Sequence, residues 1–189
     1  MYTYRFSETE IFEIISIWSE IANEKGGTFK NILCTGPGYQ NSMDSVLKKF
    51  ELLIPNFQNT SIIFTTSETH PLRVDYKFTK DLGFEFQISP EDFLFKISKL
   101  FGAKEVEIGI KEVDDEFIFK SDNALLINYL MDEKSIRYLQ GIALSAINLN
   151  SNDCSELDMV LAVNERDKDQ MLKLLEFIEN MIQKLYDWR

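Results

Sequence analysis

The sequence is poor in the residues that most often build metal centres and nucleophilic sites. It contains one histidine, His70, and two cysteines, Cys34 and Cys154, without a CxxC pair. A structural zinc site needs about four such ligands at short spacings, so the sequence excludes one. A serine triad would have to use His70 as its base, and the GxSxG elbow is absent. The sequence leaves open whether Cys34 and Cys154 lie close together.

Basic residues and long apolar runs are also scarce. The chain has 20 Lys and Arg against 31 Asp and Glu, a net charge of −11, and Lys48-Lys49 is its only adjacent basic pair. Because binding to a phosphate backbone needs a basic face, we expect no nucleic-acid partner. The first residues lack the basic and apolar regions of a signal peptide, and no apolar run approaches the roughly 20 residues of a membrane span. The sequence therefore predicts a cytoplasmic protein that does not contact a membrane.

What the chain does contain is enough apolar material for a core. Of its 189 residues, 44% are hydrophobic and 15 are phenylalanine. A chain of this length buries about 70% of its unfolded surface when it forms one domain. We predict a single α+β domain over residues 1–189, with acidic residues that keep it soluble.

Several segments carry helix signals. Ser7-Glu8-Thr9-Glu10 matches a capping box, and Gly26-Gly27 would end the helix behind it. Ser89-Pro90 is a strong helix start, with proline where the first helical turn tolerates it. Apolar residues at helical spacing, with their caps, predict further helices. The expected helices cover residues 8–25, about 42–54, 90–101, 122–131, 132–140 and 164–185.

Other segments alternate between apolar and polar residues, as half-buried strands do. Residues 72–79 and 82–88 alternate on either side of Lys80-Asp81, which predicts an antiparallel hairpin. A second hairpin is expected from residues 106–110 and 117–119. Shorter strands are expected at 29–34, 61–65 and 157–163, and residues 142–149 fit either a strand or a helix. The fold class is therefore α+β, with a mostly antiparallel sheet built from hairpins and covered by amphipathic helices.

Three features of the sequence share residue types with nucleophilic or anion-binding sites. His70 lies in a His-Pro pair typical of a loop or strand start, and Cys34 is better explained as a buried structural cysteine. The loop Gly36-Pro37-Gly38 leads toward an expected helix, but it lacks the P-loop lysine and both nucleotide-binding glycine patterns. The sequence therefore assigns no catalytic, cofactor-binding or metal-binding residue, and no cofactor.

Acidic clusters have local explanations. Glu91-Asp92 falls in a first helical turn, and Asp114-Asp115-Glu116 falls in an expected turn. Asp132-Glu133 is a third pair. Asp153, Glu156 and Asp158 superficially resemble a calcium loop but lack its central glycine and its ladder of acids. Trp188 lies at the C-terminal end of the last expected helix. We expect it to dock on the core rather than project to a partner.

A local resemblance covers about residues 106–139. The segments Val106-Glu107-Ile108-Gly109-Ile110, Asp115 to Asn123, Leu130 and Ile136-Arg137-Tyr138-Leu139 resemble a pattern in uncharacterised bacterial domain families of unknown function. In that pattern an acidic turn joins two strands, and a Lys-Ser-Asn/Asp cap then starts a helix. These families carry no assigned activity, so the resemblance implies a bacterial source and no chemistry.

The function is not decided by these features. We favour a non-catalytic bacterial protein that binds another protein, and the acidic charge suggests a basic partner. One alternative is a small-molecule-binding or enzymatic domain with a pocket between the sheet and the helices. Another is a dimeric structural module that associates through an apolar helix face. The oligomeric state is left open.

Overall fold

One antiparallel sheet organises the molecule, and its helices pack against it. The computed structural model describes residues 6–35, 46–56, 59–91, 104–151 and 154–188. The helices are α1 (Glu8–Lys25), α2 (Lys111–Asp114), α3 (Ala124–Leu130), α4 (Glu133–Gln140) and α5 (Lys168–Asp187). The strands are β1 (Thr28–Thr35), β2 (Val46–Pro55), β3 (Ser61–Ser67), β4 (His70–Lys77), β5 (Phe86–Pro90), β6 (Lys104–Val106), β7 (Phe117–Ser121), β8 (Leu144–Asn150) and β9 (Glu156–Leu161).

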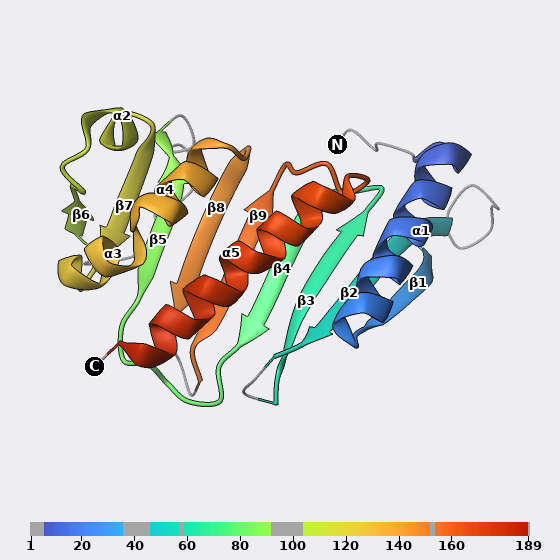
Figure 1. The fold of residues 1–189 in the computed structure, drawn as a ribbon, viewed down its shortest axis with the longest axis horizontal. Helices are drawn as coiled ribbons and strands as arrows, with labels where there is room; N and C mark the ends of the chain where they lie inside the picture. Colours follow the sequence, from blue (N-terminus) through green and yellow to red (C-terminus); the bar gives the residue numbers. More distant parts are fainter. Residues whose placement is uncertain (1–5, 36–45, 57–58, 92–103, 152–153, 189) are drawn as a thin grey trace.

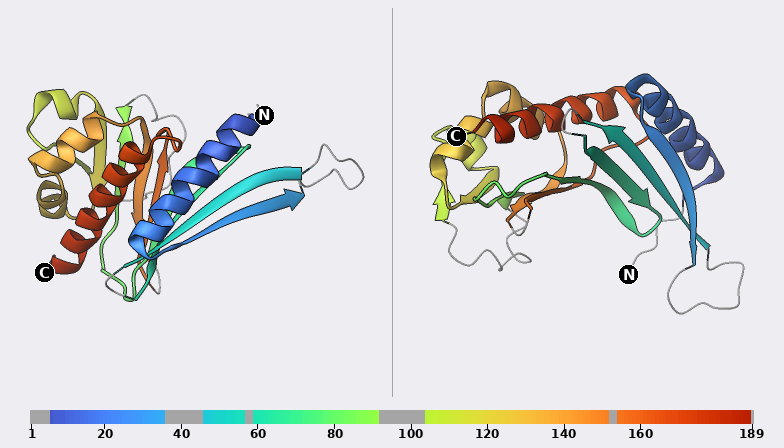
Figure 2. Two further views of the ribbon diagram at one scale, coloured as in Figure 1. Left: turned by 45° about the vertical axis from the view of Figure 1, so that its right-hand side comes forward. Right: turned by 90° about the horizontal axis from the view of Figure 1, so that it is seen from below.

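The nine strands form a sheet in the order β1-β2-β3-β4-β9-β8-β5-β7-β6 (Figure 1). Every pair of neighbouring strands is antiparallel. This confirms the predicted α+β class with an antiparallel sheet. Helices α1, α3, α4 and α5 lie on one side of the sheet (Figure 2). We call that side the covered face and the opposite side the open face.

The covered face carries an unbroken apolar row. Strand register places one large apolar residue of each strand beside the next, from one edge of the sheet to the other. Side chains directly opposite on antiparallel strands lie within contact distance, so this row forms the floor of the core. In strand order the row is Phe29, Leu52, Phe64, Val74, Met159, Ile147, Ile88, Phe119 and Val106.

Helix ends follow the local sequence closely. Ser7 and Glu10 form the predicted capping box, and α1 ends at Gly26, whose φ of 66° is left-handed. Asp132 accepts a hydrogen bond from the Ser135 amide at 2.8 Å and so caps α4. Trp18 and Phe64 fill the space between α1 and the sheet, both essentially without exposure. The indole of Trp18 still donates a hydrogen bond to the Glu165 carbonyl at 3.0 Å.

The helix predicted near residues 42–54 is wrong, because residues 46–55 form strand β2. Phe50, Leu52 and Ile54 alternate with partly exposed neighbours, as a strand requires. Leu53 also lies on the open face, so apolar residues occur on both faces and imitate helical spacing. Pairing with β1 and β3 supplies main-chain hydrogen bonds that a reading of local spacing does not include.

The hairpin predicted between residues 72–79 and 82–88 is also wrong. The predicted alternation of buried and exposed residues holds for 72–78 but fails at Gln87, which is buried in β5. Strand β4 pairs with β3 and β9, whereas β5 pairs with β7 and β8. Two strands, β9 and β8, therefore lie between β4 and β5 in the sheet. Alternation determines which side chains are buried, but any strand with a matching apolar face can become the neighbour.

The remaining boundaries shift by a few residues. The strand predicted at residues 106–110 is wrong except at Val106, because β6 covers Lys104–Val106 and helix α2 follows; β6 nevertheless pairs antiparallel with β7, the predicted partner region. Asn123 rather than Ser121 caps α3, and Asp167 rather than Asn164 caps α5. The ambiguous residues 142–149 mostly form β8. Pro90 belongs to β5, and the helix expected behind it falls on residues 92–103, outside the described residues.

Candidate functional site

The open face carries a groove over the middle of the sheet. It has a volume of about 630 Å³. Leu53 of β2 and Ile63 of β3 supply apolar lining, and Arg73 and Asp75 of β4 with Asp158 of β9 supply charge. Cross-strand register explains the grouping, because Leu53, Ile63, Asp75 and Asp158 are successive partners along one row. The site is therefore a direct product of strand order.

A second hollow adjoins this groove. It has a volume of about 460 Å³ and shares Arg73 and Asp75 with the first. Its other lining residues include Lys49 of β2, Thr65 of β3 and His70 at the start of β4. The two hollows together run across β2, β3, β4 and β9, and we call them the open-face groove.

One guanidinium is shared between two carboxylates at the centre of the open-face groove. The Nε of Arg73 lies 3.0 Å from Oδ1 of Asp75 and 3.0 Å from Oδ1 of Asp158. Its single Nε hydrogen is donated to Asp75. Among the described residues, Oδ1 of Asp158 accepts no hydrogen bond. One cation thus faces two anions, and Asn148 of β8 also hydrogen-bonds to the carboxylate of Asp158, the more buried of the two.

The surroundings of Asp158 disfavour its charged form. Its side chain is 23% exposed, and loss of solvent is the main reason that its pKa is raised. The Arg73 charge opposes that shift, while the neighbouring Asp75 charge adds to it. A carboxylate held in a groove where its charge is disfavoured is a candidate for binding a cation.

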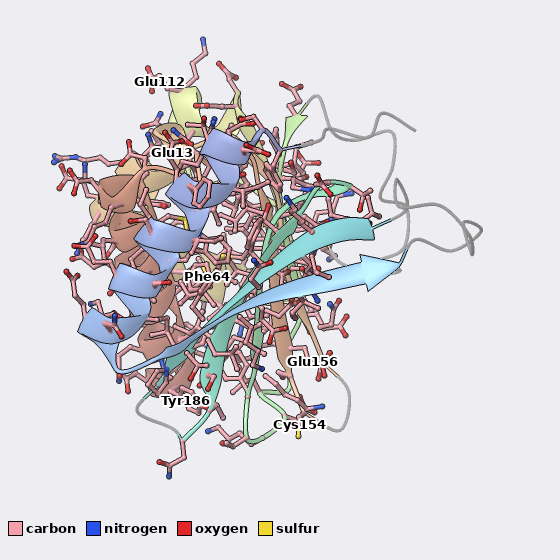
Figure 3. All side chains as sticks on the ribbon, turned by 90° about the vertical axis from the view of Figure 1, so that its right-hand side faces the viewer. Glu13, Phe64, Glu112, Cys154, Glu156 and Tyr186 are labelled. Carbon is pink, nitrogen blue, oxygen red and sulfur yellow. The ribbon has the colours of Figure 1, made fainter. Side chains whose placement is uncertain are left out.

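A second ion pair lines the groove. Lys77 of β4 and Glu156 of β9 approach to 3.0 Å. Figure 3 shows Glu156 on the side of the sheet away from the helices, whereas Phe64 lies between the sheet and the helices. The lining of the 630 Å³ groove therefore contains three carboxylates and two cationic side chains. The adjoining hollow adds Lys49, so an excess of carboxylates is confined to the 630 Å³ part of the open-face groove.

The sequence candidates do not converge on this centre. His70 borders the second hollow, but it interacts within its own turn, with its Nδ1 2.8 Å from the Thr69 hydroxyl and 3.4 Å from that of Ser67. Cys154 is a free, half-buried thiol beside the start of β9. Cys34 belongs to β1, and Gly36-Pro37-Gly38 lies outside the described residues.

Two of the acidic clusters have structural uses in the described residues. Asp114 accepts the amides of Ile108 and Gly109, each at 2.8 Å, and so closes the β6–α2 connection. Asp132 caps α4. Asp92 and Asp153 lie outside the described residues. Within the part of the chain that the structure describes, no three His, Cys, Asp or Glu side chains come together as a metal site.

The sequence reading missed the charged centre although its signal was present. Arg73, Asp75 and Lys77 alternate with the buried residues of β4, which is the pattern of any strand with one solvent-exposed face. Their significance depends on Asp158, which reaches them only because β9 pairs with β4.

Trp188 behaves as predicted, half-buried with its ring 5.2 Å from that of Tyr129. Among the described helices, none combines the length and apolar character needed to cross a bilayer.

Comparison with known proteins finds a structure with a similar fold but no protein with a similar sequence. No family model matches the chain, and no curated protein matches it. A crystal structure of the mycobacterial trehalose monomycolate transport factor A, TtfA, is similar with a TM-score of 0.56 and 8% sequence identity. The match covers 94% of this chain and 97% of that chain. At this identity the likeness shows a shared fold and transfers no residue role.

Proposed function

We propose that this chain is a non-catalytic binding protein whose open-face groove receives a basic segment of another protein. The observation that carries the proposal is the guanidinium of Arg73, whose single positive charge is shared by Asp75 and Asp158 at the groove centre. A lysine or arginine side chain from a partner would supply the missing positive charge. Leu53 and Ile63 would contact the apolar neighbours of that side chain.

The groove suits a protein segment in its extent and composition. It crosses several strands and mixes apolar and charged side chains, as partner-binding surfaces do. The layer between the sheet and the helices is filled instead by large buried side chains such as Trp18, Phe50 and Phe86. The TtfA neighbour is named a transport factor, which describes transport rather than a catalysed reaction. This supports a binding role and says nothing of the partner.

The test uses a defined probe and two charge-matched double variants. The probe is a fluorescent peptide of alternating leucine and lysine, and the same peptide with glutamate in place of lysine is its control. We expect Asp75→Asn/Asp158→Asn to weaken binding of the lysine peptide about tenfold, because each lost charge pair is worth on the order of 1 kcal/mol. Glu107→Gln/Glu112→Gln removes the same net charge elsewhere and should leave affinity unchanged.

Fluorescence anisotropy measures the affinities, and amide chemical shifts locate the bound peptide on β4 and β9. Binding should weaken as salt is added, because it depends on charge. If both double variants weaken binding equally, the attraction is to net charge and the groove has no special role. If the glutamate peptide binds as well as the lysine peptide, the proposal is wrong.

A further inference from the structure

A buried glutamate lies at the turn between β3 and β4. Among the residues that the structure describes, Glu68 is the only charged one that is buried, with 6% of its surface exposed. Burial alternates along β3 and continues into the turn, through Phe64 and Thr66 to Glu68. Glutamate is rarely buried unless its charge is paired. A buried Glu68 in a turn of only two residues is therefore exceptional.

The charge of Glu68 has little compensation within the protein. Its Oε2 accepts a hydrogen bond from the Lys48 amide at 2.9 Å, and its own amide donates to the Lys48 carbonyl at 3.3 Å. These bonds extend the pairing of β2 with β3 by one residue. In the described part of the chain, no Lys, Arg or His nitrogen lies within 4.0 Å of the carboxylate. A buried charge without a counter-ion is unfavourable, so the site is suited to a cation from outside.

Glu68 lines a cavity of about 320 Å³ at the end of the covered face. Leu72 of β4 and Leu161 of β9, which are register partners on that face, supply part of its apolar wall. Phe6, just before α1, supplies more of it. The cavity therefore places one buried carboxylate beside apolar side chains from three separate parts of the chain.

The residues next to Glu68 add hydrogen-bond acceptors to the same cavity. Thr66, Ser67 and Thr69 all line it and carry hydroxyl groups. The register between β3 and β4 shifts between Thr65 and Ser67. An irregularity of this kind changes the direction of nearby side chains and is common beside binding sites. A carboxylate with neighbouring hydroxyl oxygens can accept the three N–H bonds of an ammonium group.

We propose that this cavity binds a small organic ammonium ion. The ammonium group pairs with Glu68, and the aliphatic part of the ligand packs against Phe6, Leu72 and Leu161. The volume is at the lower end of the range for ligand pockets, so the ligand is small. A metal ion fits less well, because no three acidic, His or Cys side chains of the described residues form a metal site. The inference does not rest on the proposed function of the open-face groove.

Isothermal titration calorimetry tests the proposal with n-propyl-, n-butyl- and n-hexylammonium chloride. The control ligand is n-butanol, which has nearly the shape of n-butylammonium but no charge, and sodium chloride keeps the ionic strength equal. We expect saturable binding of the ammonium ions and binding of n-butanol that is weaker by about tenfold or more. Failure of all three ammonium ions to saturate overturns the inference, and so does equal affinity for n-butanol.

Two charge-matched variants test the role of the carboxylate. Glu68→Gln keeps an oxygen that can accept the Lys48 amide but removes the charge, whereas Glu107→Gln removes the same charge from an exposed residue. We expect Glu68→Gln to weaken n-butylammonium binding about tenfold or more, and Glu107→Gln to leave it unchanged. Urea titration should show that Glu68→Gln is at least as stable as the wild type, because an uncompensated buried charge is lost. A variant that loses stability and keeps its affinity would show a structural role for Glu68 and overturn the inference.

Amide chemical shifts of the wild type locate the ligand without any substitution. Addition of n-butylammonium should move the signals of residues 66–70 and 161–163. Changes centred instead on Asp75 and Asp158 would place the ammonium ion in the open-face groove, and the inference would be wrong.

The same variants separate this cavity from the open-face groove. Asp75→Asn/Asp158→Asn should bind n-butylammonium as the wild type does, and Glu68→Gln should bind the leucine–lysine peptide as the wild type does. Either proposal can therefore fail while the other holds. If Glu68→Gln weakens the peptide and leaves n-butylammonium unaffected, the cavity receives a lysine side chain of a partner, and the inference of a free small ligand is overturned.

Discussion

The covered and open faces of the sheet are formed by the same strands but carry different kinds of residue. On the covered face, register aligns one apolar row that crosses all nine strands. One residue further along, the row on the open face runs from Leu53 and Ile63 to polar and charged residues. These are Asp75, Asp158, Asn148, Gln87, Lys120 and Glu105. Because side chains alternate along every strand, one set of pairings produces both rows.

The difference shows which positions are available for binding because packing does not determine them. Core positions are constrained by packing, since each must fill a shape left by its neighbours. The open face has no such constraint over the groove, yet it holds Asp158 in a place that disfavours its charge. A residue that does not serve stability at its position is a reasonable candidate for function.

The largest expected effect comes from the covered face. Phe86 is fully buried in β5, so Phe86→Ala should lower the free energy of unfolding by about 3–5 kcal/mol, through lost burial and the cavity left behind. Ile63→Ala, on the open face of β3, is the matched change and should cost about 1 kcal/mol. Urea titration measures both. Equal costs would show that the two faces are packed alike.

A carboxylate among the covering helices should stabilise the fold. Burial alone would raise the pKa of Asp132, but hydrogen bonds from Lys184 and Ser135 outweigh it and lower the pKa to about 2. Lys184 lies 2.7 Å away and links α5 to the cap of α4. Asp132→Asn should therefore cost about 1 kcal/mol at pH 7, after allowance for solvent screening.

The pH dependence of the free energy of unfolding shows whether the Asp132 charge stabilises the fold. A lowered pKa means that the stability from Asp132 is present above the unfolded value of about 4 and is lost as the pH falls through about 2. The stabilities of the wild type and Asp132→Asn should converge at the acid end of a urea titration series. A constant difference down to pH 2 would show that the ion pair with Lys184 contributes nothing.

Replacing Asp158, the carboxylate on the open face, should change the free energy of unfolding in the opposite direction and by the smallest amount. Burial raises the pKa of Asp158, so the folded state holds that proton more tightly than the unfolded state. Its contribution to stability therefore decreases as the pH rises through the interval above about 4. Asp158→Asn should raise the free energy of unfolding at pH 7, by about 1 kcal/mol or less. A clear loss of stability would mean that the ion pair with Arg73 dominates instead.

Local features of this fold were predictable because they depend on neighbours in the chain. The capping box at Ser7, the glycine that ends α1 and the cap at Asp132 are all short-range hydrogen-bond patterns. The alternation of residues 72–78 correctly predicted which side chains are buried. The prediction failed for β2, where Leu53 on the open face completed a false helical stripe. Local spacing cannot show that both faces of a strand carry apolar residues.

The sequence by itself determined the antiparallel α+β class, the ends of α1 and α4, and the net negative charge. Only the tertiary structure decided that β4 lies beside β9 rather than β5. That choice brings Asp158 to Arg73 and Asp75, and it leaves β1 at an edge. Strand pairing is a contact between distant segments, selected by the fit of whole faces, and alternation along one strand carries no record of its neighbour.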